Sequence, residues 1–232
     1  MLWYKGWLET RLRVLFVFGN ILFLVGLSLR YIDPPLPRAV VENLLSSLAV
    51  LLLFIPVVLG GAGINAPRIL FGAAKGLHGS MYFTLSLPVS RLRLLATRAG
   101  LGMLETVGVL AALSCVAWFM LPAPRVYVTV SGLFAHWVTV SICISAFYSL
   151  SVFFATFLGD QEQAGASATL IIILLLLFRA VSVPASVNIF RAMGQSSPLI
   201  THTFPWASMG ISLGVAAIMF LAAMRVVQTH EY

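Results

Sequence analysis

Long apolar runs separated by short charged segments dominate the chain, and this pattern predicts membrane-spanning helices. A spanning helix needs about 20 mostly apolar residues, with a range of about 17 to 25. Six runs approach that length, at about residues 14–31, 44–64, 99–121, 126–158, 164–183 and 206–227. The run LIIILLLLF at 170–178 lacks the alternation of a barrel strand. We therefore expect an all-α, polytopic bundle of six transmembrane helices that forms a single domain over residues 1–232.

The composition agrees with burial in lipid. Hydrophobic residues make up 60% of the chain and charged residues only 9%, whereas charged residues make up about 25% of a soluble domain. The net charge is +7, but the Lys and Arg residues lie at the ends of apolar runs rather than in basic patches. We therefore expect these charges to control the topology in the membrane. The expected partner is the lipid bilayer and not a nucleic acid.

The distribution of Lys and Arg predicts the orientation in the membrane. Cytoplasmic loops of membrane proteins carry an excess of these two residues. With a cytoplasmic N-terminus, nine of the 14 Lys and Arg residues lie on the cytoplasmic side and five on the other side. Both termini are then cytoplasmic, and we expect a multi-pass protein of the plasma membrane, of the bacterial inner-membrane type.

The first 13 residues have the pattern of an amphipathic helix. On a helical wheel their aromatic and leucine side chains share one broad arc, and three charged residues lie opposite, at Lys5, Glu9 and Arg13. Helices with Trp and basic residues in this pattern lie in the membrane interface. We expect residues 1–13 to form an interfacial helix that leads into the first span, either as a simple anchor or as a contact surface.

Residues 65–98 form the longest hydrophilic stretch, and this stretch is longer than a turn between two spans requires. Pro88 disfavours a helical conformation in the residue before it, and Ser90 is a typical N-cap residue. We therefore expect a short cytoplasmic helix that ends near Leu87. A new helix is expected to run from Arg91 into the third span.

Two further segments depart from the simplest pattern of spans and turns. Residues 184–205 on the far side contain three prolines and either dip into the membrane as a helical hairpin or form an ordinary surface loop. The fourth run, 126–158, is too long for one untilted span. We expect part of that run to project beyond the membrane.

The sequence contains little that predicts chemistry. Phosphate-loop, dinucleotide-binding, zinc-protease and CxxC motifs are absent, and the four His residues are scattered. Cys115 and Cys143 have no second metal ligand nearby in the sequence, so no metal site is expected. The absence of the motifs above likewise predicts no catalytic residue and no bound cofactor. Glu105 is the exception, because a carboxylate at mid-membrane costs about 2.5–3.5 kcal/mol. Glu105 either lines a pathway or locks helices together, or it lies near enough to the cytoplasmic interface to reach water or Arg98.

The stretch GSMYFTLSLPVSR at 79–91, followed by Leu94, Leu95 and Arg98, resembles the cytoplasmic stretch before the third span of ABC-2-type transporter permeases. The Trp-rich beginning and the six-span plan are similar to those permeases over nearly the whole chain. The resemblance implies a membrane subunit of an ATP-driven exporter. Such a subunit pairs with a second permease, as a homodimer or heterodimer, and binds separate ABC ATP-binding subunits. ATP and Mg²⁺ are then bound by the partner subunit, and this chain is not an enzyme.

In that family, the short helix between the second and third spans docks on the ATPase. The resemblance therefore implies docking residues in this chain at Lys75, His78, Ser80, Met81, Tyr82, Phe83, Leu87, Ser90, Arg91 and Arg93. The substrate does not follow from the resemblance.

Two other classes of function remain open. A membrane-embedded lipid-modifying enzyme needs clustered acids or His residues, whereas Glu105, Asp160 and Glu162 are far apart in the sequence. An assembly or anchor protein would also bind partners through residues 65–98, but without ATP-linked transport. A phosphate loop in a neighbouring reading frame would favour the permease over both.

Overall fold

The computed structural model describes residues 2–30, 51–60, 90–120, 129–158, 160–181 and 183–229. The regular elements in these ranges are all helices, which confirms the predicted all-α class. The helices are α1 (Leu2–Arg30), α3 (Phe54–Gly60), α5 (Arg91–Met120), α7 (Val130–Ala155), α8 (Asp160–Ala180), α9 (Ile189–Met193), α10 (Pro198–Thr201) and α11 (Trp206–Thr229).

Four of the described helices are long and apolar enough to cross a membrane. The candidate spans are Leu92–Val116 in α5, Val130–Ala155 in α7, Glu162–Ala180 in α8 and Trp206–Thr229 in α11. They correspond to the third to sixth predicted spans. The predicted count of six is therefore confirmed for four helices and stays a prediction for the first two.

The beginning of the chain differs from the prediction of an interfacial helix followed by a separate span. Helix α1 runs without a break from Leu2 to Arg30. Its sequence contains no proline, and one face of the helix stays packed against the bundle on both sides of the predicted boundary, with Gly6, Thr10, Val17 and Ile21 buried. At about 1.5 Å per residue, its 29 residues span about 43 Å.

Only part of the predicted second span, 44–64, lies among the described residues, and that part contains α3. Pro56 is fully buried in the first turn of α3. A proline is tolerated there because the N–H that it lacks has no partner within the helix at that position.

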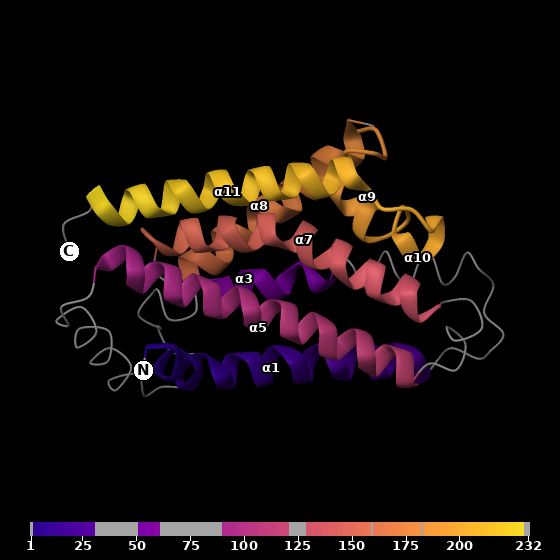
Figure 1. Cartoon of the computed structure of the whole chain (residues 1–232), viewed down its shortest axis with the longest axis horizontal. Helices are drawn as coiled ribbons and strands as arrows, with labels where there is room; N and C mark the ends of the chain where they lie inside the picture. Colours follow the sequence, from indigo (N-terminus) through magenta and orange to yellow (C-terminus); the bar gives the residue numbers. More distant parts are fainter. Residues whose placement is uncertain are drawn as a thin grey trace.

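The helices form a bundle with their long axes roughly aligned (Figure 1). Helix α1 lies on one side beside α5, while α3 and α7 lie between α5 and the opposite layer of α8 and α11. The beginning of α1, the beginning of α5 and the end of α11 all lie at one end of the bundle, which we call the terminal end. The beginning of α7 and the short helix α10 lie at the other end.

The apolar core runs through the centre of the bundle, and α7 contributes to it together with its neighbouring helices. Val140, Cys143, Ile144 and Phe147 of α7 are buried in one cluster with residues of α1, α3, α5, α8 and α9. Large apolar side chains on the outer faces of the long helices remain exposed. These faces suit contact with lipid rather than water, because a soluble protein rarely exposes so large an apolar surface.

The predicted far-side segment 184–205 contains the two short helices α9 and α10. Asn188 and Ser197 cap them by accepting hydrogen bonds from the backbone N–H groups of Arg191 and Leu199, each at 3.1 Å. Met193 is fully buried, and the Phe190 ring lies 5.6 Å from the Phe147 ring of α7. Part of this segment is therefore helical and packed against α7, and its position relative to the membrane stays a prediction.

Candidate functional site

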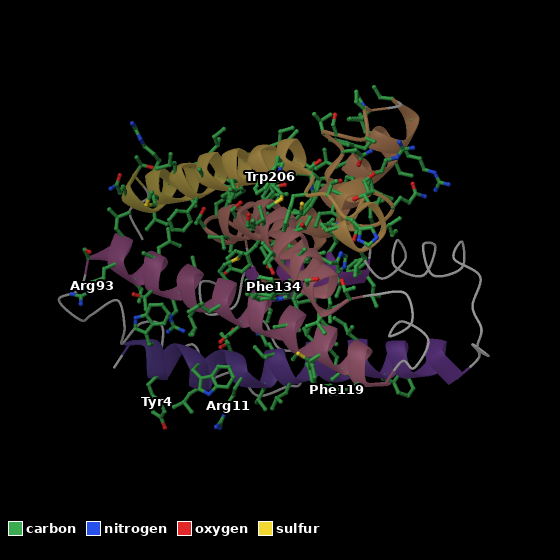
Figure 2. All side chains as sticks on the ribbon, turned by 45° about the vertical axis from the view of Figure 1, so that its right-hand side comes forward. Tyr4, Arg11, Arg93, Phe119, Phe134 and Trp206 are labelled. Carbon is green, nitrogen blue, oxygen red and sulfur yellow. The ribbon has the colours of Figure 1, made fainter. Side chains whose placement is uncertain are left out.

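The end of the predicted docking segment is described by the structure, and it forms the beginning of α5. The Ser90 side chain accepts a hydrogen bond from the backbone N–H of Arg93 at 3.3 Å, and its carbonyl accepts one from Leu94 at 3.1 Å. The prediction that Ser90 caps a helix beginning at Arg91 is thus confirmed. Arg93 is exposed at the terminal end of the bundle (Figure 2).

The other predicted docking residues lie outside the described part of the chain. They are Lys75, His78, Ser80, Met81, Tyr82, Phe83 and Leu87. The predicted short helix that contains them therefore stays a prediction.

Glu105 forms a buried polar contact between α5 and α1. Only 7% of its surface is exposed, and its Oε1 accepts a short hydrogen bond from the hydroxyl of Thr10, which is also buried. The Thr10 hydroxyl also lies 3.1 Å from the carbonyl oxygen of Gly6, one turn earlier in α1. Glu105 thus joins α5 to α1, while its predicted roles stay predictions.

The electrostatic surroundings of Glu105 are only partly complementary. Arg98, two turns earlier in α5 and also buried, attracts the Glu105 carboxylate. The second carboxylate oxygen, Oε2, is buried without a hydrogen-bond partner among the described residues. A buried unsatisfied acceptor of this kind costs about 1–3 kcal/mol, or more when it is charged.

The contact between α1 and α5 continues toward the terminal end through small residues. A Cβ atom at Gly6 would lie 2.7 Å from Leu101 Cδ2, and one at Gly100 would lie 3.4 Å from the Trp3 ring. Residue numbers therefore rise together along the two helices, so α1 and α5 are parallel neighbours.

A second buried polar contact joins α3, α7 and α8. The Gln163 side-chain amide donates a hydrogen bond to the carbonyl oxygen of Val57 at 3.1 Å and a short one to the Ser151 hydroxyl. The Ser151 hydroxyl is also 3.3 Å from the same carbonyl, and Ser167 lies beside Gln163. Val57 is in the last turn of α3, where helix carbonyls lack intrahelical partners. Side chains of α7 and α8 thus satisfy that carbonyl.

Two glycines let the helices around this contact approach closely. A Cβ atom at Gly60 would lie 2.5 Å from Ser151 Cβ and 3.3 Å from the Tyr148 carbonyl oxygen. A Cβ atom at Gly102 of α5 would collide with the Tyr148 hydroxyl, which donates a hydrogen bond to the Ala99 carbonyl at 2.8 Å. Both positions therefore require the smallest residue.

At the opposite end, His136 of α7 contacts the cap of α10. The His136 Nδ1 atom lies 2.7 Å from the hydroxyl of Ser197, which is fully buried. The same hydroxyl accepts a hydrogen bond from the Leu199 N–H at 3.1 Å. This contact holds α10 against α7, as expected for a histidine satisfied within the fold.

Sequence reasoning identified Glu105 but missed Thr10, Gln163, Ser151 and Ser197. Neutral polar side chains are common in spans and carry no charge that would single them out. The four-residue spacing of Gln163 and Ser167 does place them on one helix face. Their partners lie on other helices, however, and no pattern along the chain pairs them.

The acidic residues are not gathered into a reactive site in the part of the chain that the structure describes. Glu105 is engaged with α1, while Glu162 is exposed on α8. Among the described residues, no group of three or more His, Cys, Asp or Glu side chains lies close enough to hold a metal ion.

No known protein family, curated protein or solved structure matches the chain.

Proposed function

We propose that the chain is the membrane-spanning permease subunit of an ATP-driven ABC-2-type transporter, working as an exporter. In this proposal the chain forms the substrate pathway, and an ABC ATP-binding subunit on a separate chain supplies the energy. The observation that carries the proposal is the position of Ser90. Ser90 ends the segment that resembles the ABC-2 docking stretch, and it caps the beginning of α5. The beginning of α5 lies at the terminal end, as do the beginning of α1 and the end of α11 (Figure 1).

The buried polar contacts support a coupling role for this end of the bundle. Helix α5 begins at Arg91 and is held to α1 by Glu105 and Thr10 within its first half. The Gln163 contact lies near the beginning of α8 and joins α3, α7 and α8. A force applied at Ser90 would therefore move α5 and α1 together.

The proposed mechanism is rigid-body movement of helix groups around a shared pathway. Closure of the ATPase subunits on ATP would displace the docking segment, and α5 would carry that displacement into the bundle. Alternating access of this kind requires no covalent chemistry in the membrane subunit. Two copies of the permease, identical or different, would enclose the pathway.

The two rival functions have less support. The lipid-modifying enzyme would need clustered acids or His residues, and among the described residues no group of three or more His, Cys, Asp or Glu side chains could hold a metal ion. The assembly or anchor protein would use the same cytoplasmic surface, so only ATP-linked activity separates it from the permease.

The proposal is tested by purifying the full-length chain from its native membranes through a C-terminal tag. Labelling with a photoreactive ATP analogue should mark a separate co-purifying polypeptide, and the complex should hydrolyse ATP. Replacement of residues 81–87 by a Gly/Ser sequence should remove the labelled polypeptide while the chain stays in the membrane. A matched replacement of exposed residues 201–203 at the other end should leave it bound.

Three outcomes would contradict the proposal or its docking surface. Absence of any ATP-labelled partner would favour the anchor protein, and so would a partner without ATPase activity. Retention of the ATPase after replacement of residues 81–87 would overturn the assigned docking segment.

A further inference from the structure

Two buried side-chain atoms in the described part of the chain have no hydrogen-bond partner there. They are Oε2 of Glu105 and Oγ of Ser141, in side chains that are 7% and 8% exposed. Buried polar atoms in folded proteins nearly always have a partner, because an unsatisfied one lowers stability. Two such atoms in one bundle therefore direct attention to what could bind between their helices.

Ser141 lies on the side of α7 that faces α5. One turn before it, the Trp137 indole N–H donates a hydrogen bond to the Val107 carbonyl of α5 at 3.4 Å. Two turns after it, the Tyr148 hydroxyl donates to the Ala99 carbonyl of α5 at 2.8 Å. Residues four and seven apart lie on one face of a helix. Ser141 therefore shares the α5-facing side with both aromatic residues.

Glu105 lies at the same level of the contact between α5 and α7. It is located on α5 between Ala99 and Val107, the two residues whose carbonyls the aromatic side chains reach. Ser141 is located on α7 between those two aromatic residues. The Tyr148 hydroxyl is also close enough to the Glu105 carboxylate to interact with its charge. The two unsatisfied atoms thus lie at one level of neighbouring helices.

The groups at this level match the chemistry of an ammonium group. An ionised carboxylate only accepts hydrogen bonds, a hydroxyl can accept them, and an ammonium group has three donors and no acceptor. The rings of Trp137 and Tyr148 lie on either side of Ser141, and aromatic faces attract cations. A sugar or alcohol could satisfy the hydrogen bonds but would leave the charge of Glu105 unopposed on this side.

The surroundings also restrict the remainder of such a ligand. Beyond Glu105, the α5 residues Val109, Leu110 and Leu113 are buried in the apolar core. A polar body would lose its hydration there without gaining hydrogen bonds. Arg98 attracts the carboxylate from the terminal end, yet Oε2 has no hydrogen-bond partner among the described residues. One carboxylate oxygen is thus available to a second cation.

We propose that α5 and α7 form a binding site for an amphipathic amine, with its ammonium group on Glu105 and Ser141 and its apolar body among the helices. The inference rests on the proposed function and deepens it, because it names protonated, lipid-soluble amines as the substrate class of the permease. Glu105 also accepts the Thr10 hydroxyl of α1. An ammonium group on its second oxygen would therefore bind directly at the contact between α1 and α5.

The test is binding of a fluorescent amine to the full-length chain, purified in detergent with any partner that accompanies it. Dansylcadaverine carries a primary ammonium group on an apolar body, and its N-acetyl derivative has the same body without the charge. Equilibrium dialysis measures binding of both probes. We expect saturable binding of dansylcadaverine and binding of the acetylated probe that is at least about 10-fold weaker, because a hydrogen bond to a charged group is lost.

Variants assign the binding to the two residues. Glu105→Gln should weaken binding of dansylcadaverine about 10- to 100-fold, and Ser141→Ala about 2- to 10-fold. Gly214→Ala on α11 is the control, since its Cβ would meet nothing within 4 Å, and it should bind as the unaltered chain does. Thermal unfolding separates lost binding from misfolding. Ser141→Ala should unfold at an unchanged temperature, because the Ser141 hydroxyl has no partner to lose.

Three results would overturn the inference. These are no saturable binding of dansylcadaverine, equal binding of the acetylated probe, or unchanged binding in the Glu105→Gln or Ser141→Ala variant. Failure of amine binding while the ATP-labelled partner still co-purifies would contradict the substrate class alone. Amine binding that depends on Glu105 in a chain without any ATP-labelled partner would instead contradict the proposed function alone.

Discussion

Two of the buried polar contacts described above are built from different chemistry. The contact of α3, α7 and α8 is neutral, and its Gln163, Ser151 and Ser167 side chains have no buried atom without a partner. The contact of α1 and α5 contains the carboxylate of Glu105, and one of its oxygens is unsatisfied. In the first contact the buried polar atoms have hydrogen-bond partners. In the second contact the unsatisfied Glu105 oxygen lowers the stability of the folded state.

This difference indicates which helices are fixed and which are suited to move. A satisfied neutral network in an apolar interior makes one arrangement strongly preferred. A charged contact with an unsatisfied oxygen loses less when it opens, because water or another donor can then satisfy that oxygen. We therefore expect α3, α7 and α8 to form the rigid part of the bundle. If the proposed function is right, α1 and α5 form the part that responds to the ATPase.

The largest expected effect comes from removing the carboxylate. Glu105→Leu should lower the free energy of unfolding by about 3–5 kcal/mol, because it leaves the buried charge of Arg98 without this opposing charge. Glu105→Gln should cost about 1 kcal/mol, since the Thr10 hydroxyl can still donate to the amide oxygen. Reversible unfolding in mixed micelles measures both. Equal effects of the two variants would show that the charge is unimportant for the lock.

The glycine contacts of the rigid part should show the next largest effect. Gly60→Ala should destabilise the chain by about 1–3 kcal/mol, because its Cβ would lie 2.5 Å from Ser151 Cβ and the neighbouring backbone would have to shift. Gly214→Ala is the matched control, since its Cβ would meet nothing within 4 Å. Thermal unfolding of the two variants in detergent distinguishes them. A Gly60→Ala variant as stable as the control would refute the close packing of α3 on α7.

Loss of the neutral network should cost somewhat less. Gln163→Leu should lower the unfolding free energy by about 1–2 kcal/mol, because the Val57 carbonyl and the Ser151 hydroxyl lose a buried donor. Limited proteolysis should also release the region of α3 sooner. If Gln163→Leu has no effect while Glu105→Leu is severe, the assignment of rigid and responsive parts is reversed.

The smallest effect is expected at the exposed helix cap. Ser90→Ala should cost about 0.5–1 kcal/mol and should loosen only the first turn of α5, where the Ser90 side chain accepts the Arg93 N–H. Hydrogen exchange of the Arg93 amide should become faster, while the amides near Glu105 stay protected. Loss of protection at both places would mean that the cap controls the whole helix.

Much of the architecture followed from the sequence, because apolar length and helix caps are local signals. The runs that became α5, α7, α8 and α11 were predicted, and so was the cap at Ser90. The continuity of α1 was not predicted, since the charges of residues 1–13 suggested a boundary that helix packing overrides. The contacts of Thr10 and Gln163 depend on which helices become neighbours in space. No pattern along the chain contains that information.

The proposed function requires an orientation in which Ser90 and both termini face the cytosol and the α9–α10 segment faces outward. Single cysteines at Ser90 and at the exposed Gln195, in the Cys115→Ser, Cys143→Ala background, test it with a membrane-impermeant thiol reagent. The account predicts labelling of Gln195→Cys in intact cells and of Ser90→Cys only in inverted vesicles. Labelling of Ser90→Cys from outside intact cells would contradict the account.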